Sequence, residues 1–423
     1  MCRGEKPAGV LVVQHTPHEG PYALRTALEA AGLPVRVCRT WAGDPVPSST
    51  AGLAALVVTG DSAAAYGDAS SSALPSAELA LLRAALEAEV PVLGVGLGAR
   101  LLAVAGGGTA RPGEAPRTGW GEVRTAPGAP ADPLFAGLPG RLRVLHRHGD
   151  TVDSPAGATP LARCDRDQVQ AFRIGATAWG LRFHLEEDGA TAGTAAAPGP
   201  EEATPGELLT PDPHRDQLYA RFATLVASRA VGTATRAFFT SRAATWEERF
   251  GADGPRYAAA VSRMRLRAGQ RVLDVGCGSG RALPALRAEV GVGGVVLGAD
   301  LTPAMLAAAA REGRTGLLLA DACRLPLGDG SLDGIFSAGL VDHVPDPVAA
   351  LQEWARVTAP GGVLLLFHPS GRAERAARHG RPLDPADPLA QENLRPALHA
   401  TGWGLARYED AAHHFLARAV RAG

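Results

Sequence analysis

The residues with the clearest chemical potential form a glycine-rich turn in the second half of the chain. Residues 271–280 read RVLDVGCGSG, which predicts a buried strand, a turn and the start of a helix. Gly276, Gly278 and Gly280 let backbone amides approach a ligand without side-chain obstruction, and a helix N-terminus favours anionic groups. The spacing G-x-G-x-G differs from the G-x-G-x-x-G of dinucleotide-binding turns, because Arg281 stands where a later glycine would fall.

Acidic residues stand where two later strands of the same segment end. VVLGADLTPAML ends a strand on Asp300, beside Leu301, where a carboxylate could accept hydrogen bonds from both hydroxyls of a ribose. LLLADACRLPL ends another strand on Asp321 and Ala322, which suit the edge of an adenine ring. These residues support a ligand site at the glycine turn.

A parallel sheet is needed to bring such residues together. From Val10 onward, short apolar strands alternate with helical segments, and a second series of this kind begins near Leu266. The alternation predicts a doubly wound parallel sheet in each half. In the first half, RLRVLHRHGD, QVQAFRIG and AWGLRFHLE predict strands of an added antiparallel edge. The predicted fold class is therefore α/β, with two doubly wound domains.

The domain boundary is predicted from a change in composition. A chain of 423 residues is too long for one ordinary core. Residues 188–213 are small, rich in Pro and Gly, and without apolar period, which predicts a mobile loop or linker. Residues 215–231 predict an amphipathic helix that closes the first domain. We therefore expect domains at 1–231 and 232–423.

From about Phe238 to its end, the chain resembles class I S-adenosylmethionine-dependent methyltransferases of the small-molecule type seen in quinone biosynthesis. The resemblance implies a Rossmann-like fold and S-adenosyl-L-methionine as cofactor. Asp274 and the three glycines match the family's D-x-G-x-G-x-G motif, Asp300 its ribose-binding acid, and Asp321 its adenine-side acid. Cys277 lies inside the turn, as a cysteine commonly does in this family, and is interpreted as a packing residue.

Catalytic residues are harder to assign, because methyl transfer mainly requires alignment of the acceptor and exclusion of water. A base is needed only if the acceptor must lose a proton. His343 and His368 follow the carboxyl ends of strands, and either could be that base; alternatively, His343 orders its loop and His368 caps a strand. Trp246 and Phe250 could form a substrate wall or belong to an ordinary core. Whether oxygen, nitrogen or carbon is methylated stays open.

A second motif lies in the first half, where PVLGVGLGARLLA predicts a sharp strand-to-helix elbow at residues 94–98. With RTGWGEV and the segments around HRHGD and FHLE, it resembles class I glutamine amidotransferases related to the glutaminase part of GMP synthase. The resemblance covers about Val10 to Val231 and implies a flavodoxin-like fold. In that family, a cysteine within G-x-C-x-G attacks the glutamine amide, with His and Glu downstream as base and orienter.

The nucleophile of that family is missing here. Its position is Gly96, whereas His184 and Glu186 stand where the partner His and Glu belong. A base without a nucleophile cannot form the glutamyl thioester, so we expect a degenerate site and no glutaminase activity. The domain could retain a pocket for a regulatory ligand or be an inert remnant. Further departures from the family pattern are Asp61, Arg100, Arg147, Arg182 and Leu185.

Composition limits the partners. The formal net charge is -1, which argues against a broad electrostatic footprint for nucleic acid. The five cysteines have no paired spacing, so no metal site is expected. Neither a secretory segment nor a membrane span is expected, and the predicted location is the cytoplasm. The partner is then a small-molecule methyl acceptor, and the oligomeric state cannot be read.

Two other functions compete with methyl transfer. A non-enzymatic regulatory protein is disfavoured by the intact glycine turn and acidic residues. An NAD-dependent oxidoreductase is disfavoured by the glycine spacing. It is also disfavoured by GWGLARYEDAAHHFLARAVR, which predicts a terminal antiparallel strand pair after a helix, as is typical of methyltransferases.

Overall fold

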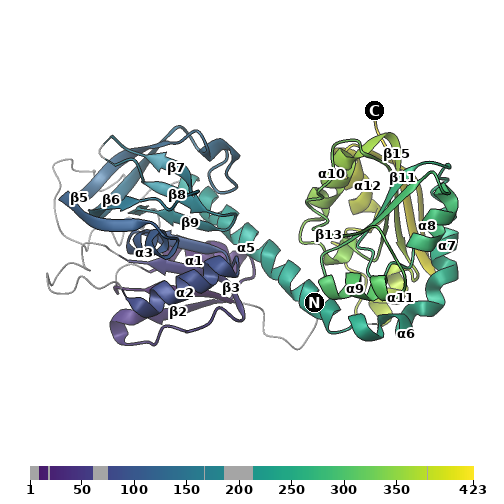
Figure 1. Ribbon diagram of the computed structural model, residues 1–423, viewed down its shortest axis with the longest axis horizontal. Coiled ribbons are helices and arrows are strands. Elements are labelled where there is room, and N and C mark those ends of the chain that lie inside the picture. Colours follow the sequence, from purple (N-terminus) through teal and green to yellow (C-terminus); the bar gives the residue numbers. More distant parts are fainter. Residues whose placement is uncertain (1–8, 18–19, 61–74, 166, 185–212, 379) are drawn as a thin grey trace. The chain divides into compact units, whose positions relative to one another are not determined.

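The computed structural model describes residues 9–17, 20–60, 75–165, 167–184, 213–378 and 380–423. The chain separates into two compact units, Met1–Ala230 and Val231–Gly423. In Figure 1, each unit is a sheet with helices packed against it. The predicted loop at 188–213 lies almost wholly outside the described residues, as do Glu186 and Asp61.

The first unit contains a five-stranded parallel sheet in the order β2-β1-β3-β4-β9, which is the flavodoxin-like order. These apolar strands are β1 (Gly9–Gln14), β2 (Val35–Arg39), β3 (Leu53–Thr59), β4 (Val92–Val95) and β9 (Ala178–Leu181). Between them run α1 (Tyr22–Ala30), α2 (Ser76–Glu87) and α3 (Leu97–Ala105), with η1 (Thr40–Ala42). The predicted doubly wound α/β fold is confirmed for this unit.

Antiparallel strands extend this sheet beyond β9. They are β5 (Thr109–Thr125), β6 (Arg141–Asp153), β7 (Thr159–Arg163), β8 (Ala171–Ile174) and β10 (Phe183–His184), with η3 (Ala129–Ala131) between β5 and β6. One prediction was wrong in part, because Phe183 and His184 of AWGLRFHLE join this edge as β10, whereas the AWGL segment does not. It forms β9, which pairs in parallel with β4 and antiparallel with β8. Local alternation could not distinguish the two pairings.

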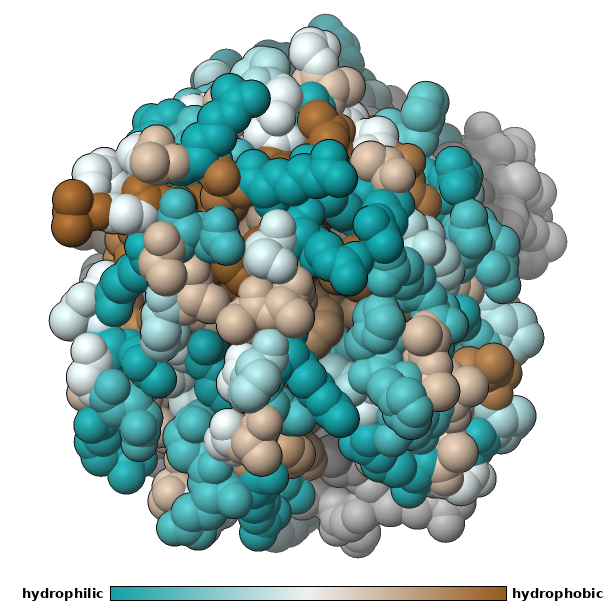
Figure 2. Space-filling model, turned by 90° about the vertical axis from the view of Figure 1, so that its right-hand side faces the viewer, coloured by the Kyte–Doolittle hydropathy of each residue, from teal (hydrophilic) through white to brown (hydrophobic). Residues whose placement is uncertain are grey.

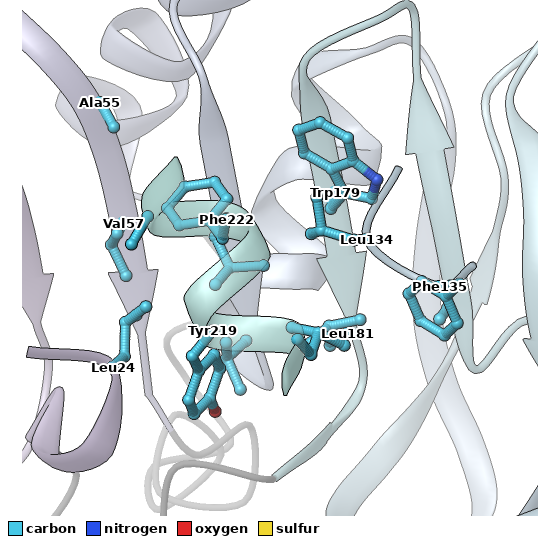
Figure 3. Close-up of a cluster of buried hydrophobic side chains, with 14 of the residues drawn as sticks. Leu24, Ala55, Val57, Leu134, Phe135, Trp179, Leu181, Tyr219 and Phe222 are labelled. Atoms are coloured by element: carbon cyan, nitrogen blue, oxygen red, sulfur yellow. The ribbon is translucent and has the colours of Figure 1, made fainter. Parts of the chain in front are cut away.

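Helix α5 (Pro213–Thr240) closes the core of the first unit with its initial turns. Tyr219 and Phe222 are fully buried there among Leu24, Val57 and Leu181 (Figure 3). The rings of Trp179 and Phe222 meet edge to face at 6.3 Å between centroids. The predicted helix over 215–231 is therefore present and packs as expected.

Helix α5 runs through the expected domain boundary, which lies one residue from the division between the two compact units. The expected domain boundary at 231/232 falls inside α5, which continues to Thr240. Gly232 is the residue with the poorest helix propensity near the boundary, and a single glycine costs about 1 kcal/mol, too little to break a long helix. Beyond it come η4 (Ala243–Thr245), α6 (Trp246–Phe250), η5 (Gly251–Asp253) and α7 (Gly254–Ser262).

The second unit has a seven-stranded sheet in the order β13-β12-β11-β14-β15-β17-β16. The first five strands are parallel: β11 (Arg271–Val275), β12 (Val295–Asp300), β13 (Leu317–Leu319), β14 (Leu332–Ala338) and β15 (Thr358–His368). The last two, β16 (Trp403–Ala411) and β17 (His414–Arg421), are antiparallel. The helices are α8 (Leu283–Val290), α9 (Pro303–Arg311), α10 (Pro347–Val357), α11 (Arg372–Arg378) and α12 (Gln391–Ala400), with η6 (Val341–His343).

This strand order is Rossmann-like, and the order reverses direction between β11 and β14, which is the place where folds of this kind bind ligands at the carboxyl edge. The Rossmann-like fold and the antiparallel terminal pair are both confirmed. Strand β15 contains a bulge at its Pro-Gly-Gly segment. Its partner register jumps from Leu332↔Thr358 to Gly334↔Val363, and Gly361 takes a φ of +78°.

Exposed apolar residues are scattered. The face shown in Figure 2 is mainly hydrophilic, with small separate groups of hydrophobic residues. Such single residues are normal on a protein surface and identify no docking patch. In the described part of the chain, no helix combines the length and apolarity that a membrane crossing requires.

Candidate functional site

The glycine turn lies at the carboxyl end of β11, at the point where the strand order reverses. Gly276, Gly278 and Gly280 have φ values of +72°, +55° and +79°, a region that other residues rarely adopt. A Cβ atom on Gly276 would lie 2.9 Å from the Leu340 side chain, and one on Gly280 would lie 2.9 Å from Leu283 and Arg314. Conformation and space therefore both require glycine here, and the turn is held by its own backbone, since the N–H groups of Gly276 and Gly280 donate to the carbonyls of Ala299 and Cys277 at 2.8 Å.

Asp300, the last residue of β12, already holds this turn in shape. One carboxylate oxygen accepts the backbone N–H of Gly278 at 2.9 Å, and the other accepts that of Thr302 at 2.8 Å. Burial raises the pKa of Asp300, and these backbone hydrogen bonds oppose the rise. A carboxylate has about four acceptor positions, so both oxygens can also bind ligand hydroxyls.

Asp274 stands beneath the turn on β11 and is only 2% exposed. Burial, followed by the nearby charge of Asp300, raises the pKa of Asp274 to about 8, against a partial opposing effect from Arg281. A carboxyl with such a pKa can lose its proton when a cationic group binds beside it.

The other predicted cofactor residues lie on the same edge. Asp321 follows β13 by two residues, and its carboxylate caps the backbone N–H of Cys323 at 2.8 Å. The carbonyl of Ala322 accepts the indole N–H of Trp354, and Leu301 directly follows Asp300. Cys277 is 8% exposed, and burial raises the pKa of its thiol, as a packing residue requires. The strand topology thus brings the turn, Asp300 and Asp321 to one edge.

The sequence analysis did not predict the contacts between the glycine turn and the helices that precede β11, which we call the helical segment 246–262. Glu247 on α6 accepts a hydrogen bond from the Ser279 hydroxyl. Arg281 donates to the carbonyl of Phe250 at 3.0 Å and lies over the ring of Tyr257 at 4.8 Å. The sequence did contain a hint that Arg281 has a role, since Arg281 occupies the position where a dinucleotide-binding turn has glycine. Its partners could not be read because they precede the turn by about 30 residues.

Trp246 and Phe250 are not ordinary core residues. Their rings meet at a 48° tilt with centroids 4.8 Å apart, and Phe250 is 37% exposed. Phe239 contacts both Trp246, at 5.5 Å, and the ring of His343, at 5.2 Å. A layer of aromatic residues, formed by Phe239, Trp246 and Phe250, therefore connects the helices before β11 to the loop after β14.

The two histidines proposed as bases are both poor proton acceptors in this structure. His343 lies in η6 after β14, and burial lowers its pKa. His368 ends β15, where burial, together with the charge of Arg375, lowers its pKa to about 4. The Nδ1 atom of His368 lies 3.0 Å from the backbone N–H of Ser370, which orders the chain after the strand. The strand-capping interpretation of His368 matches this geometry.

The elbow of the first unit has the strained shape expected of its motif. Gly96 has φ +58° and ψ -113° between β4 and α3. A Cβ atom at this position would lie 2.3 Å from the carbonyl oxygen of Gly60 and 2.9 Å from the ring of His184. His184 therefore faces the elbow, as its role in the family implies, but there is no room for a side chain between them.

The backbone around the elbow is closed as well. The N–H of Leu97, the residue after the nucleophile position, donates to the carbonyl oxygen of Gly60 at 2.7 Å. In such elbows this N–H belongs to the oxyanion hole. Beside it, His15 links the carbonyl of Thr59, at 2.6 Å, to Glu78, at 2.7 Å. This His15–Glu78 pair was not singled out from the sequence because its members are 63 residues apart.

Two of the arginines that depart from the family pattern meet at one aspartate. Arg182 is 1% exposed and contacts both Asp150 and Asp167, and its guanidinium lies 3.1 Å from Nδ1 of His148. Arg100 lies 3.5 Å from the other oxygen of Asp150. The two substitutions are therefore coupled through a buried ion-pair cluster next to the elbow.

Comparisons with known proteins agree with this geometry. A methyltransferase domain family matches residues 273–366, the class I glutamine amidotransferase family matches 69–197, and the peptidase C26 family matches 23–112. Methyltransferase GfsG of Streptomyces halstedii is 38% identical over 111 residues, covering 25% of this chain and 39% of that protein. O-methyltransferase rstn1 of Aspergillus nomiae is 30% identical over 152 residues, covering 34% of this chain and 68% of that protein.

The chain belongs to the S-adenosylmethionine-dependent methyltransferase family. S-adenosyl-L-methionine is therefore its cofactor, and its N-terminal part is of the class I glutamine amidotransferase type. The solved structure of a glutamine amidotransferase from Thermotoga maritima is 24% identical in sequence to the matched part of this chain. The match covers 53% of this chain and 99% of the Thermotoga protein, with a TM-score of 0.43. The chain spans 31% and 39% of the length of two curated relatives that it matches.

Proposed function

We propose that this methyltransferase transfers a methyl group to a small-molecule acceptor, and that its amidotransferase-type unit does not hydrolyse glutamine. The observation that carries the first part is the preformed glycine turn, whose amide at Gly278 is held by the Asp300 carboxylate at 2.9 Å. The proposal places the reaction in the cytoplasm, with no nucleic-acid or membrane partner.

The cofactor supplies a methyl group on a positively charged sulfur, which is a good leaving group. The glycines of the turn would border the cofactor, and the turn keeps this shape only with glycine, because a Cβ at Gly276 or Gly280 would collide with neighbouring side chains. Asp300 binds the ribose hydroxyls, while Asp321, with Ala322, borders the adenine. Asp274 balances the positive charge once its proton is lost. Leu301 and Cys277 complete the walls.

Alignment and exclusion of water are the main demands on the acceptor side. The aromatic layer of Phe239, Trp246 and Phe250 is suited to cover the reacting atoms. His343, in contact with that layer, and His368, with its pKa near 4, are neutral at physiological pH. Neither is tuned as a strong base, so the proposal favours an acceptor that needs little help to lose a proton.

The closed elbow supports the second part of the proposal. Glutaminase chemistry needs a thiolate beside His184 and free N–H donors for the oxyanion. The chain has Gly96 at the nucleophile position, and the Leu97 N–H is engaged by Gly60.

One assay separates these claims. The intact chain is incubated with methyl-labelled S-adenosylmethionine and a panel of small phenols, acids and amines. Label should move into the small-molecule fraction with stoichiometric release of S-adenosylhomocysteine, and Asp300→Ala should abolish the transfer. Label that moves into acid-precipitable protein or nucleic acid would contradict a small-molecule acceptor. Release of glutamate from glutamine by the wild type would contradict the loss of glutaminase activity.

A further inference from the structure

Two antiparallel strands at one edge of the second sheet carry a cluster of arginines. Arg407 on β16 lies directly opposite Arg418 on β17, so both side chains emerge on the same face. On that face Glu409 is opposite Leu416, and its carboxylate lies 3.6 Å from the guanidinium of Arg263, directly after α7. The cluster therefore includes both strands and the end of α7. Strands β14 and β15 separate it from β11, which carries the glycine turn.

The carboxylate of Glu409 is already shared among three neighbours. One oxygen accepts a hydrogen bond from Arg407 and lies near Arg263, and the other lies 2.9 Å from Nε2 of His414. These contacts, with the hydrogen bond to His414 as the largest cause, lower the pKa of Glu409. One negative charge therefore faces the two positive charges of Arg263 and Arg407, and Glu409 cannot balance a further arginine.

Arg418 is a half-buried cation without a counter-charge. Its Nε atom is buried and has no hydrogen-bond partner among the described residues, and no ion pair in the described part of the chain includes it. Burial lowers the pKa of Arg418, and the positive charge of Arg265 lowers it further. The two guanidinium groups therefore lie close enough to repel each other, and the local electrostatic potential is positive.

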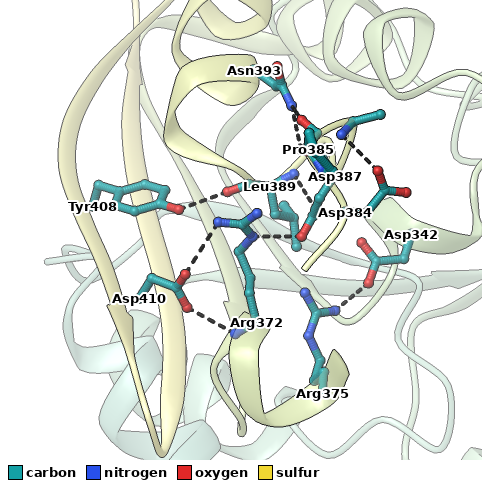
Figure 4. Close-up of polar contacts among 11 residues, drawn as sticks. Asp342, Arg372, Arg375, Asp384, Pro385, Asp387, Leu389, Asn393, Tyr408 and Asp410 are labelled. Atoms are coloured by element: carbon teal, nitrogen blue, oxygen red, sulfur yellow. Dashed lines mark hydrogen bonds and ion pairs between the residues drawn. The ribbon is translucent and has the colours of Figure 1, made fainter. Parts of the chain in front are cut away.

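An arginine on the other side of the same hairpin shows the usual arrangement. Asp387 accepts the Nε–H of Arg372 at 2.6 Å, and Asp410 accepts its backbone N–H at 2.9 Å (Figure 4). Charges that are taken out of water normally have such partners, because an unpaired one costs free energy. Arg418 therefore lacks the anionic partner that a guanidinium in its surroundings normally has.

Arg265 has a strained backbone next to this cluster. Its φ is +59°, in the left-handed region that residues other than glycine rarely adopt. The residue follows the end of α7 at Ser262, where chains commonly use glycine for this conformation. Strain of this kind is found most often at functional positions. The chain thus carries a guanidinium at a position where glycine would suit the fold better.

We propose that Arg265 and Arg418 form a binding site for a phosphate group in its doubly charged state, as at the end of a phosphate monoester. Their two unbalanced positive charges match two negative charges, whereas a carboxylate would balance only one. A guanidinium also presents its N–H donors in a planar fork that fits phosphate oxygens. The site is separate from the glycine turn and does not rest on the proposed methyl transfer.

The test compares phenyl phosphate with benzoate, which share a ring and differ in their anionic group. Each is titrated by calorimetry into the full chain at about pH 8, where a phosphate monoester is a dianion. S-adenosylhomocysteine is present to occupy the glycine turn. Phenyl phosphate should bind with a Kd of about 1 mM or lower, and benzoate at least about 10-fold more weakly. Inorganic phosphate is the third probe: affinity equal to that of phenyl phosphate indicates the free ion as ligand, and weaker affinity indicates a monoester.

Variants locate the site. Arg418→Met and Arg265→Gly should each weaken binding of phenyl phosphate about 10-fold, as expected for loss of a charge-assisted hydrogen bond. Arg265→Gly should unfold at the same or a higher urea concentration than the wild type, because glycine adopts the left-handed backbone without strain. Arg311→Met is the matched control, since it removes an exposed arginine from α9 of the same unit and should leave binding unchanged.

Equal affinity for phenyl phosphate and benzoate would overturn the proposal, as would absence of phenyl phosphate binding at about 10 mM. Undiminished binding by both Arg418→Met and Arg265→Gly would also contradict it. Binding of S-adenosylhomocysteine is measured in the same samples and reports separately on the proposed function.

Discussion

The backbone N–H of Leu97 donates a 2.7 Å hydrogen bond to the carbonyl oxygen of Gly60. The same carbonyl lies 2.3 Å from where a Cβ atom on residue 96 would stand. One peptide group therefore occupies both the oxyanion position and the space of the missing nucleophile. Glycine at position 96 tolerates the φ of +58° and leaves that peptide group in place.

Restoring the cysteine alone should therefore fail to restore glutaminase activity. Gly96→Cys places a Cβ against Gly60 and His184, and we expect it to destabilise the first unit by about 1–3 kcal/mol through strain and overpacking. Glutamate release from glutamine should stay at background, and urea unfolding should shift to lower concentration. Glutaminase activity in a stable Gly96→Cys protein would show that the Gly60 peptide moves aside easily.

The buried ion-pair cluster should be essential to the stability of the first unit. Arg182→Met leaves Asp150 and Asp167 without their main partner, and a broken buried pair costs about 3–5 kcal/mol. Arg141→Met is the matched control, since Arg141 is 69% exposed and pairs with exposed Glu122. Arg141→Met should lower the free energy of unfolding by only about 0–1 kcal/mol. Equal unfolding midpoints for the two variants in urea would contradict this account.

Cofactor binding should depend on pH through Asp274. Its pKa of about 8 means that the folded protein holds a proton that the unfolded chain loses near pH 3.8. The contribution of Asp274 to the free energy of unfolding therefore falls as pH rises from about 4 to 8. A cationic sulfonium favours the carboxylate, so affinity for S-adenosylmethionine should rise about 10-fold or more between pH 6 and 9.

S-adenosylhomocysteine is the matched control for this effect, because it differs from S-adenosylmethionine only in lacking the methyl group on sulfur and the positive charge. Its affinity should change less over the same pH range, and Asp274→Asn should make the two profiles alike. Parallel profiles for both ligands in the wild type would show that Asp274 does not sense the sulfonium.

Blocking the glycine turn should remove cofactor binding. In Gly276→Ala, the new methyl group would lie 2.9 Å from Leu340 at a φ of +72°. We expect at least a 10-fold loss of affinity for S-adenosylhomocysteine, roughly 1.4 kcal/mol or more. Gly313→Ala has the same φ and open space around it, so it should cost strain only. Undiminished binding by Gly276→Ala would place the ligand elsewhere.

Much of the fold could be predicted because periodicity and turn residues are local signals. The strand ending at Asp300, the glycine turn and the antiparallel terminal pair were all expected and are present. Pairing between distant segments could not be predicted in the same way. The parallel partner of Ala178–Leu181 depends on which edge of the sheet is free, not on its own four residues.

The site was predictable to a similar extent. Motif spacing identified Gly96, Asp274 and Asp300 as positions of interest, although their roles in binding remain predictions. Contacts such as Glu247 with Ser279, or Leu97 with Gly60, join segments more than 30 residues apart and leave no pattern in the sequence.

The central claim, that the second unit binds S-adenosylmethionine, is tested most directly by calorimetric titration of S-adenosylhomocysteine into the intact chain. The account predicts binding in the micromolar range that Asp300→Ala abolishes. Asp333→Ala should preserve that binding, because Asp333 pairs with Arg271 at the opposite end of the strands. Absence of binding to well-folded wild-type protein, or unchanged binding by Asp300→Ala, would contradict the account.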